Sequence, residues 1–149
     1  NLVLSNMYGK YDHFDEKRSH ALGAILNKVY KAKTNNEPTV NIWGTGNPIR
    51  EWLYVQDGVK AMIKASSLTG GNYFFNVGVN KGISIKDLSI KIANILDWNG
   101  DFVYDTSRPD GALEKRVDGS SSLKLLSWEP EIDLDKGLKE TVEWYVGQK

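Results

Sequence analysis

Residues 40–57 of the chain read Val40-Asn41-Ile42-Trp43-Gly44-Thr45-Gly46-Asn47-Pro48-Ile49-Arg50-Glu51-Trp52-Leu53-Tyr54-Val55-Gln56-Asp57. The pattern predicts a short strand, a tight turn, a second strand and the start of a helix, because glycine, asparagine and proline separate two aromatic-rich runs. Such a turn would hold Trp43 and Arg50 in a fixed mutual arrangement. An indole face beside a guanidinium suits a ligand with a flat base or sugar and a phosphate. The alternative is a β-hairpin with a buried Trp43 and a surface Arg50.

The composition argues against several classes of function. The 149 residues make one domain by size, or a large piece of a bigger protein. Nineteen basic and nineteen acidic residues cancel, and without a basic patch we expect no nucleic-acid partner. There is no cysteine for a disulfide or a thiolate metal site, and we expect no bound metal. Since no signal peptide or membrane-spanning apolar run is visible, we expect a cytoplasmic protein with no membrane partner.

Strands and helices alternate along the chain, which predicts an α/β fold. Further short strands are expected at residues 1–6, 73–77 and 102–104, and residues 7–18 are expected to form a polar loop. Helices are expected to begin at or near Ser19, Asp57, Ser84, Ser120 and Leu134.

Three of these helices have informative side chains. Ser84 and Asp87 form an acidic variant of the capping box at the start of the third. The other two are defined by their apolar spacing: Val59, Met62 and Ile63 share one face of the second helix, whereas Leu138, Val142 and Tyr145 face inward from the last.

The apolar runs around Val3 and Phe75 favour parallel strands that are covered on both faces. Two strands cannot form such a sheet alone, and the chain opens inside an apolar strand. We therefore expect an N-terminal portion to be absent. Exposed apolar faces and unpaired strand edges would then favour self-association.

Five short motifs occur in order along the chain: Ser5-Asn6-Met7-Tyr8-Gly9, Ser19-His20, the Trp43 to Glu51 segment, Asn76-Val77-Gly78 and Arg108-Pro109-Asp110-Gly111. Together they resemble the C-terminal half of the extended short-chain dehydrogenase/reductases of the NAD-dependent epimerase/dehydratase family. Within it the chain is most similar to the NADP-dependent epimerase/reductases that act on GDP-4-keto-6-deoxy-mannose. The likeness covers nearly the whole chain.

The resemblance implies the C-terminal part of a Rossmann-like fold. Residues 1–149 would be the substrate-binding portion, a small mixed α/β substrate domain plus strands that complete the Rossmann sheet. The N-terminal dinucleotide-binding portion would be absent. The parent protein would be an oxidoreductase and isomerase of GDP-fucose biosynthesis, a homodimer that takes NADP and a nucleotide sugar.

The resemblance also implies roles for particular residues. Leu4, Ser5, Asn6 and Met7 would lie at the nicotinamide end of NADP. His20 would approach the cofactor and serve as an acid in the epimerisation.

The residues implied to bind the substrate come from three parts of the chain. Lys28 takes the place of an arginine that usually meets the substrate diphosphate, and it keeps the charge but not the planar fork. Trp43 and Arg50 would contact the substrate directly. Asp110 and Lys115 would reach the nucleotide sugar from a C-terminal loop.

Two elements of the family pattern are missing. A glycine-rich turn that leads pyrophosphate to a helix N-terminus does not occur, since Gly44 and Gly46 precede a second strand. The Tyr-x-x-x-Lys pair is also missing, because neither Tyr8 nor Tyr11 has a lysine four residues later. We therefore expect this chain alone to bind NADP poorly and to be inactive.

Two alternatives stay open at this point. The parent protein could be another nucleotide-sugar 4-epimerase, dehydratase or 4-ketoreductase of the same superfamily, because one fold hosts all of these activities. Alternatively, the chain could be a nucleotide-sugar-binding module without chemistry, which the missing glycine-rich turn and Tyr-x-x-x-Lys pair favour.

Overall fold

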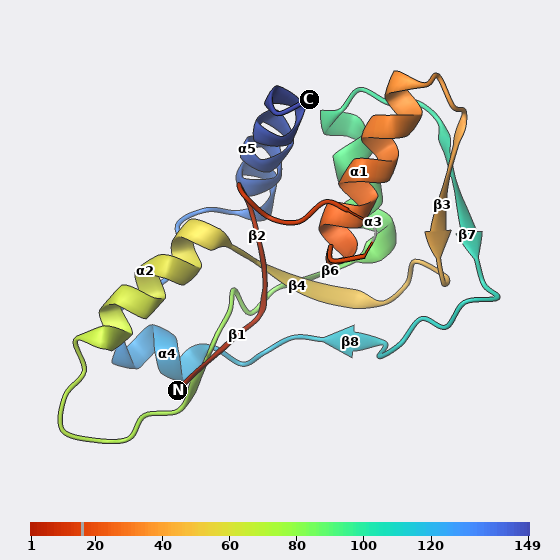
Figure 1. The fold of residues 1–149 in the computed structure, drawn as a ribbon. Coiled ribbons are helices and arrows are strands. Elements are labelled where there is room, and N and C mark those ends of the chain that lie inside the picture. The colour runs from red at the N-terminus through yellow and green to blue at the C-terminus, as the bar shows by residue number, and fades with distance from the viewer. Residues whose placement is uncertain (16) are drawn as a thin grey trace.

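The computed structural model describes residues 1–15 and 17–149, and its ribbon is shown in Figure 1. Short strands alternate with helices, as expected. The elements in chain order are β1 (Leu2–Leu4), β2 (Asn6–Tyr8), α1 (Ala21–Thr34), β3 (Thr39–Trp43), β4 (Ile49–Tyr54), α2 (Val55–Ser66), β5 (Phe75–Val77), β6 (Gly82–Ser84), α3 (Ile85–Ile95), β7 (Asp101–Asp105), β8 (Glu114–Lys115), α4 (Ser120–Leu125) and α5 (Leu134–Gly147).

The strands pair mainly in parallel, which confirms the α/β prediction. β1 pairs with β5, and β3 pairs with β7 from Thr39 opposite Asp101 to Trp43 opposite Asp105. β4 is the central strand of a four-stranded sheet. It is parallel to β2 and β8 and antiparallel to β6. Met7 and Tyr8 of β2 lie in the segment that was expected to be a loop, whereas Asn6 lies in the expected first strand. Among the described residues β2 pairs with β4, which is more than forty residues away, so the pairing leaves no local signal.

β3 and β4 do not form a hairpin. They belong to different sheets, and the turn between them carries the chain from the β3–β7 pair to the strands around β4 (Figure 1). The hairpin alternative is therefore wrong. The burial of Trp43 that it implied is wrong too, since 67% of this side chain is exposed.

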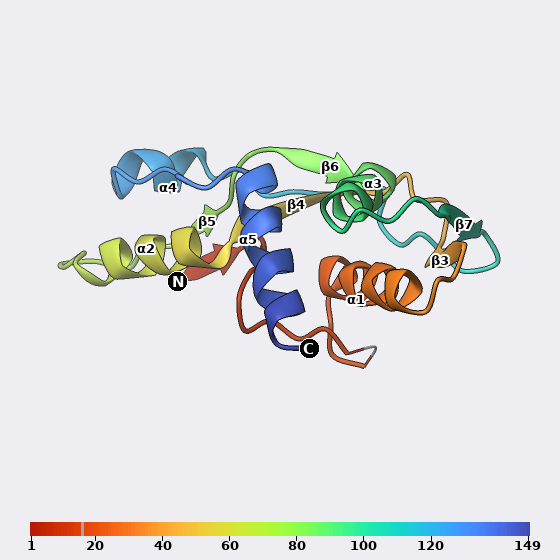
Figure 2. The ribbon, with the colours of Figure 1, turned by 90° about the horizontal axis from the view of Figure 1, so that it is seen from above.

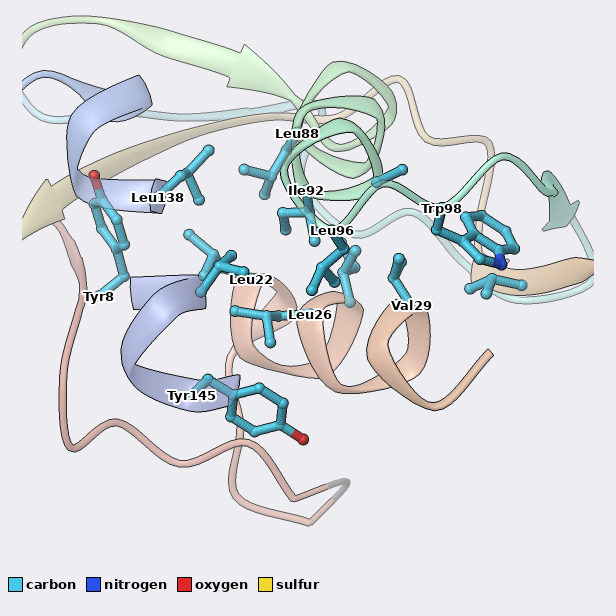
Figure 3. Packing of buried hydrophobic residues seen from close by; sticks show 14 of the residues in the cluster. Tyr8, Leu22, Leu26, Val29, Leu88, Ile92, Leu96, Trp98, Leu138 and Tyr145 are labelled. Atoms are coloured by element: carbon cyan, nitrogen blue, oxygen red, sulfur yellow. The ribbon is translucent and has the colours of Figure 1, made fainter. Parts of the chain in front are cut away.

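Helices α1, α3 and α5 enclose the main hydrophobic core. Figure 3 shows Leu22 and Leu26 of α1 directed toward Leu88 and Ile92 of α3, with Leu138 of α5 beside them. The inward positions predicted for α5 are confirmed, because its three apolar side chains are buried. The cap predicted for α3 is also present.

The helix ends differ in how well the sequence marks them. The Ser84 hydroxyl accepts the N–H of Asp87 at 3.0 Å, as the capping box requires. At α1 the N-cap is His20 rather than Ser19, and its side chain makes no capping hydrogen bond. Helix α2 begins at Val55, two residues before the expected Asp57.

The apolar face of α2 points away from the protein. Val59, Met62 and Ile63 are exposed, with 65% of Ile63 accessible, while Gly58 and Ala61 lie on the buried side. Val3 of β1 is also exposed, so the expected cover on both faces of the β1–β5 pair is not found here. Figure 2 shows α2, α4 and β5 at one end of the molecule, with β3 and β7 at the other.

None of the helices in residues 1–15 and 17–149 combines the length and the apolar character needed to span a bilayer.

Candidate nucleotide-sugar site

A cleft of about 720 Å³ lies between α1, the β3–β4 turn and the loop that follows β7. Its volume falls in the range of small-molecule sites. Four of the five residues expected to bind a substrate line it, from three separate segments: Lys28, Trp43, Arg50 and Asp110. The rest of the wall is mainly apolar and includes Ala24, Ile25, Ile42, Pro48 and Ile85.

Two glycines shape the turn that presents Trp43. Gly44 and Gly46 both have φ of +78°, a left-handed conformation that glycine adopts without strain. A Cβ on Gly46 would overlap the ring of Tyr104. The turn therefore packs closely on β7 and leaves the Trp43 indole at the mouth of the cleft.

The cleft is lined by more positive than negative charge. Among the described residues that line it, Lys17, Lys28 and Arg50 are basic and Asp110 is acidic. The Lys28 ammonium donates to the Asn41 carbonyl at 2.9 Å and lies 5.7 Å from the centre of the Trp43 ring. This charge favours an anionic ligand.

Arg50 retains most of its hydrogen-bonding capacity. Its Nη1 donates to the Ile49 carbonyl at 2.8 Å, and no ion pair of Arg50 occurs in the part of the chain that the structure describes. A guanidinium has five N–H donors, so the others can serve a ligand phosphate. Arg108 lies next to the cleft, with its guanidinium 5.2 Å from the Trp43 ring centre.

Lys115 is not part of the cleft wall. It lies on β8, directly opposite Arg50 in the β4–β8 pair, and is exposed. Residues opposite each other on paired strands share a face of the sheet, so the Arg50 and Lys115 side chains leave the sheet on the same side.

Leu4, Ser5, Asn6 and Met7 do not line this cleft. They carry the chain from β1 to β2, where Asn6 Nδ2 donates to the Glu51 carbonyl at 2.9 Å and Met7 packs on Gly58. The Ser5 hydroxyl is buried, and within residues 1–15 and 17–149 it has no hydrogen-bond partner.

His20 is not one of the residues that line the cleft, but its two neighbours in the chain are. It is exposed at the N-terminus of α1, between Ser19 and Ala21.

The tyrosines of the core are poorly suited to proton transfer. Burial, followed by the charge of Tyr54, raises the pKa of Tyr8 far above its usual value. Burial and the hydrogen bond to Glu140 raise the pKa of Tyr54 to about 12. A tyrosine that gives up its proton near neutral pH needs a lowered pKa, and neither Tyr8 nor Tyr54 has one.

Glu51 is a structural residue of the site that the sequence prediction missed. It is fully buried, and its Oε1 accepts the N–H groups of Val79 at 2.5 Å and Asn80 at 2.7 Å. Its Oε2 accepts the N–H of Val117 at 2.7 Å. Strand alternation could have indicated this, since Arg50 and Trp52 must share one face of β4 and Glu51 the other.

The family of the chain follows from this fold and from sequence similarity. The model of the NAD dependent epimerase/dehydratase family matches residues 1–78. The chain belongs to the NAD dependent epimerase/dehydratase family.

One relative in sequence and one solved structure give the degree of similarity. The chain is 37% identical over 142 residues to "Probable GDP-L-fucose synthase 1" of Oryza sativa subsp. japonica, covering 95% of this chain and 43% of the relative. It is similar in structure to a GDP-L-fucose synthetase from Naegleria fowleri bound to NADP, with a TM-score of 0.91, 25% identity, and coverage of 99% of this chain and 46% of that one.

A second similar structure contains a nucleotide sugar. It is the UDP-glucose 4-epimerase of Thermotoga maritima with UDP-glucose, with a TM-score of 0.87, 26% identity, and coverage of 99% and 45%. The chain thus spans somewhat less than half the length of each of these three proteins.

Substitution of Glu51 tests its structural role. We expect Glu51→Gln to lower the free energy of unfolding by about 1–3 kcal/mol, because the amide NH₂ would face a backbone N–H donor instead of accepting it. Urea denaturation monitored by circular dichroism measures this. Glu131→Gln is the matched control: Glu131 is exposed and pairs with Lys60 at the surface, so the change should be below about 1 kcal/mol. Equal effects of the two substitutions would contradict the role of Glu51.

Proposed function

We propose that residues 1–149 form the substrate-binding C-terminal portion of an NADP-dependent nucleotide-sugar epimerase/reductase, and that its substrate is GDP-linked. The observation that carries the proposal is the convergence of Lys28, Trp43 and Arg50 on one cleft. The indole offers a flat apolar face, and the two cations can neutralise a diphosphate. The relative named as a probable GDP-L-fucose synthase supports a guanine nucleotide.

The proposed reaction of the complete enzyme is that of GDP-L-fucose synthase. GDP-4-keto-6-deoxy-mannose would be epimerised next to its keto group through an enolate and then reduced at C4. We assign to His20 the transfer of a proton to the enolate carbon, which its exposed position between two residues that line the cleft supports. General acid catalysis of this kind accelerates a reaction about 10²–10⁴-fold.

The residues from Leu4 to Met7 fit a place beside the cofactor. They follow the carboxyl end of a parallel strand, which is where ligands bind in open α/β sheets. The buried Ser5 hydroxyl has no hydrogen-bond partner among the described residues. NADPH, when bound, supplies the hydride for C4. Because the chain has no glycine-rich turn, we expect its own affinity for NADP to be low.

The apolar face of α2 is a surface on which a dinucleotide-binding portion could pack. Val59, Met62 and Ile63 are exposed there, and among the described residues β1 pairs only with β5. An apolar face beside an open strand edge is a surface that stability requires to be covered. We propose that an N-terminal dinucleotide-binding portion covers it in the complete homodimeric enzyme, and that the chain alone self-associates through it.

Nucleotide binding to the chain tests the substrate assignment. We expect isothermal titration calorimetry to show binding of GDP that weakens about tenfold in Lys28→Ala, because a cation that faces the diphosphate is lost. Lys31→Ala is the matched control, since Lys31 is an exposed lysine on the same helix and does not line the cleft. A chain that does not bind GDP, or that binds it equally well in both variants, would rule out the assignment of this cleft.

The role of His20 requires the complete enzyme. We expect His20→Gln to slow epimerisation about 10²-fold or more while reduction of a substrate that needs no epimerisation stays measurable. Deuterium incorporation from solvent reports the first step, and NADPH oxidation reports the second. If both rates fell by the same factor, His20 would not be the epimerisation acid.

The similarity to a UDP-glucose 4-epimerase supports a second candidate, a 4-epimerase or 4-ketoreductase that takes a UDP-sugar. Titration with UDP separates the two, because tighter binding of UDP than of GDP would favour the second. Turnover by the complete protein separates both enzymes from a binding module without chemistry.

A further inference from the structure

The cleft extends along helix α1 and beyond its N-terminal end. The wall residues of α1 lie three or four positions apart and so share one face of the helix: Ala21, Ala24, Ile25 and Lys28. A rise of about 1.5 Å per residue separates Ala21 from Lys28 by roughly 10 Å along the axis. Ser19 and Lys17 continue the wall ahead of the first turn. Lys17 and Lys28 therefore lie at opposite ends of this side of the cleft.

Asp15 binds the backbone of the segment that carries Lys17. Its Oδ1 accepts the N–H groups of Lys17 at 3.2 Å and Arg18 at 3.1 Å. Its carbonyl oxygen accepts the N–H of Ser19 at 3.0 Å. The backbone donors of three successive residues thus meet one residue, which fixes the course of residues 17–19 ahead of α1.

The same carboxylate pairs with the Arg18 side chain. Its Oδ2 accepts Nε of Arg18 at 3.0 Å, and Nη2 lies at the same distance. The hydrogen bond from Arg18 lowers the pKa of the Asp15 carboxyl, which is therefore ionised at neutral pH. Arg18 is not one of the residues that line the cleft, so its guanidinium serves Asp15 and not a ligand there.

Lys17 differs from Arg18 in both respects. It lines the cleft, and no ion pair of Lys17 occurs in residues 1–15 and 17–149. Among the described lining residues three cations oppose one carboxylate, an excess of two that matches the roughly two negative charges on the diphosphate of a nucleotide sugar. Without Lys17 that match would be lost.

The proposed roles set the direction of the ligand in the cleft. His20 follows Ser19 at the N-terminal end of α1 and is assigned to the sugar, whereas the Lys28 ammonium lies 5.7 Å from the centre of the Trp43 ring. Because the sugar is joined to the β-phosphate, this direction puts the β-phosphate on the Lys17 side of the α-phosphate. A lysine ammonium on its flexible stem can bind such a phosphate as a point charge.

We infer that Lys17 binds the β-phosphate of the nucleotide sugar and that Asp15 positions Lys17 for this contact. The inference rests on the proposed nucleotide-sugar site and adds a third cation to the two assigned there. Lys17 is a binding residue, whereas Asp15 acts through Lys17 and is a positioning residue.

GDP and GMP together test the contact of Lys17, because only GDP has a β-phosphate. In titration calorimetry with the 149-residue chain, Lys17→Met should raise the Kd for GDP about tenfold and leave the Kd for GMP within about twofold. Lys31→Met is the matched control, since Lys31 is an exposed lysine of α1 that does not line the cleft. It should leave both Kd values unchanged. Equal effects of Lys17→Met on GDP and GMP would show that Lys17 does not bind the β-phosphate.

Two substitutions of Asp15 test its positioning role. Asp15→Ala removes the acceptor of two backbone N–H groups and should raise the Kd for GDP about five- to tenfold. Asp15→Asn keeps an Oδ1 acceptor and loses only an exposed ion pair, so its Kd should stay within about twofold of wild type. In the Lys17→Met background, Asp15→Ala should add less than about twofold, because the side chain that it positions is gone. A loss as large as in the wild-type background would show that Asp15 does not act through Lys17.

The outcomes separate this inference from the proposed function. If the wild-type chain binds GDP and Lys17→Met binds it equally well, the inference fails while the nucleotide site remains. If the wild-type chain binds neither GDP nor GMP, the proposed function fails and the inference fails with it, a result that the wild-type titration alone identifies.

Discussion

The buried carboxylate of Glu51 is the interaction on which the rest of the structure depends. Its three backbone donors come from the loop after β5 and from the segment after β8, so a single side chain of β4 joins three parts of the fold. Because side chains alternate along a strand, burying Glu51 directs Arg50 to the other face, toward the cleft. The same interaction holds β8 beside β4 and thereby places Lys115 next to Arg50.

The cleft combines an aromatic surface with positive charge. Trp43 supplies an exposed aromatic face at the end of β3, and Lys28 and Arg50 supply charge from α1 and β4. A ligand that uses both needs a flat apolar part and an anionic part at a fixed separation, as a sugar nucleotide has. The chemistry proposed for such a ligand is divided. This chain would bind the substrate and supply His20, and the larger part of the cofactor site would lie in a dinucleotide-binding portion.

The sequence predicted well those features that depend on neighbouring residues. The cap at Ser84 and the buried side of α5 follow from spacing within one helix, and both are confirmed. Pairing between distant segments was harder to predict. Met7 and Tyr8 of β2 were expected to be in a loop, and the hairpin alternative failed because β3 and β4 pair with strands far along the chain. The apolar face of α2 has the correct period but is exposed, since period alone does not say what covers a face.

Only part of the site could be predicted, because contacts between distant residues leave no local signal. The residues expected to bind a substrate were taken from motifs, and the structure brings Lys28, Trp43, Arg50 and Asp110 to one cleft while Lys115 lies outside its wall. Local patterns could not show that Asp110 would be bound by Thr45, sixty-five positions earlier. Nor could they show that Glu51 would accept hydrogen bonds from loops up to sixty-six positions away.

A crystal structure of the chain with GDP tests most directly whether the indole and the two cations form the nucleotide site. The account predicts the diphosphate within hydrogen-bond distance of Arg50 and Lys28, with the nucleoside against Trp43. A nucleotide bound elsewhere, such as at the carboxyl ends of β1 and β5 with the cleft between α1 and the β3–β4 turn empty, would contradict it.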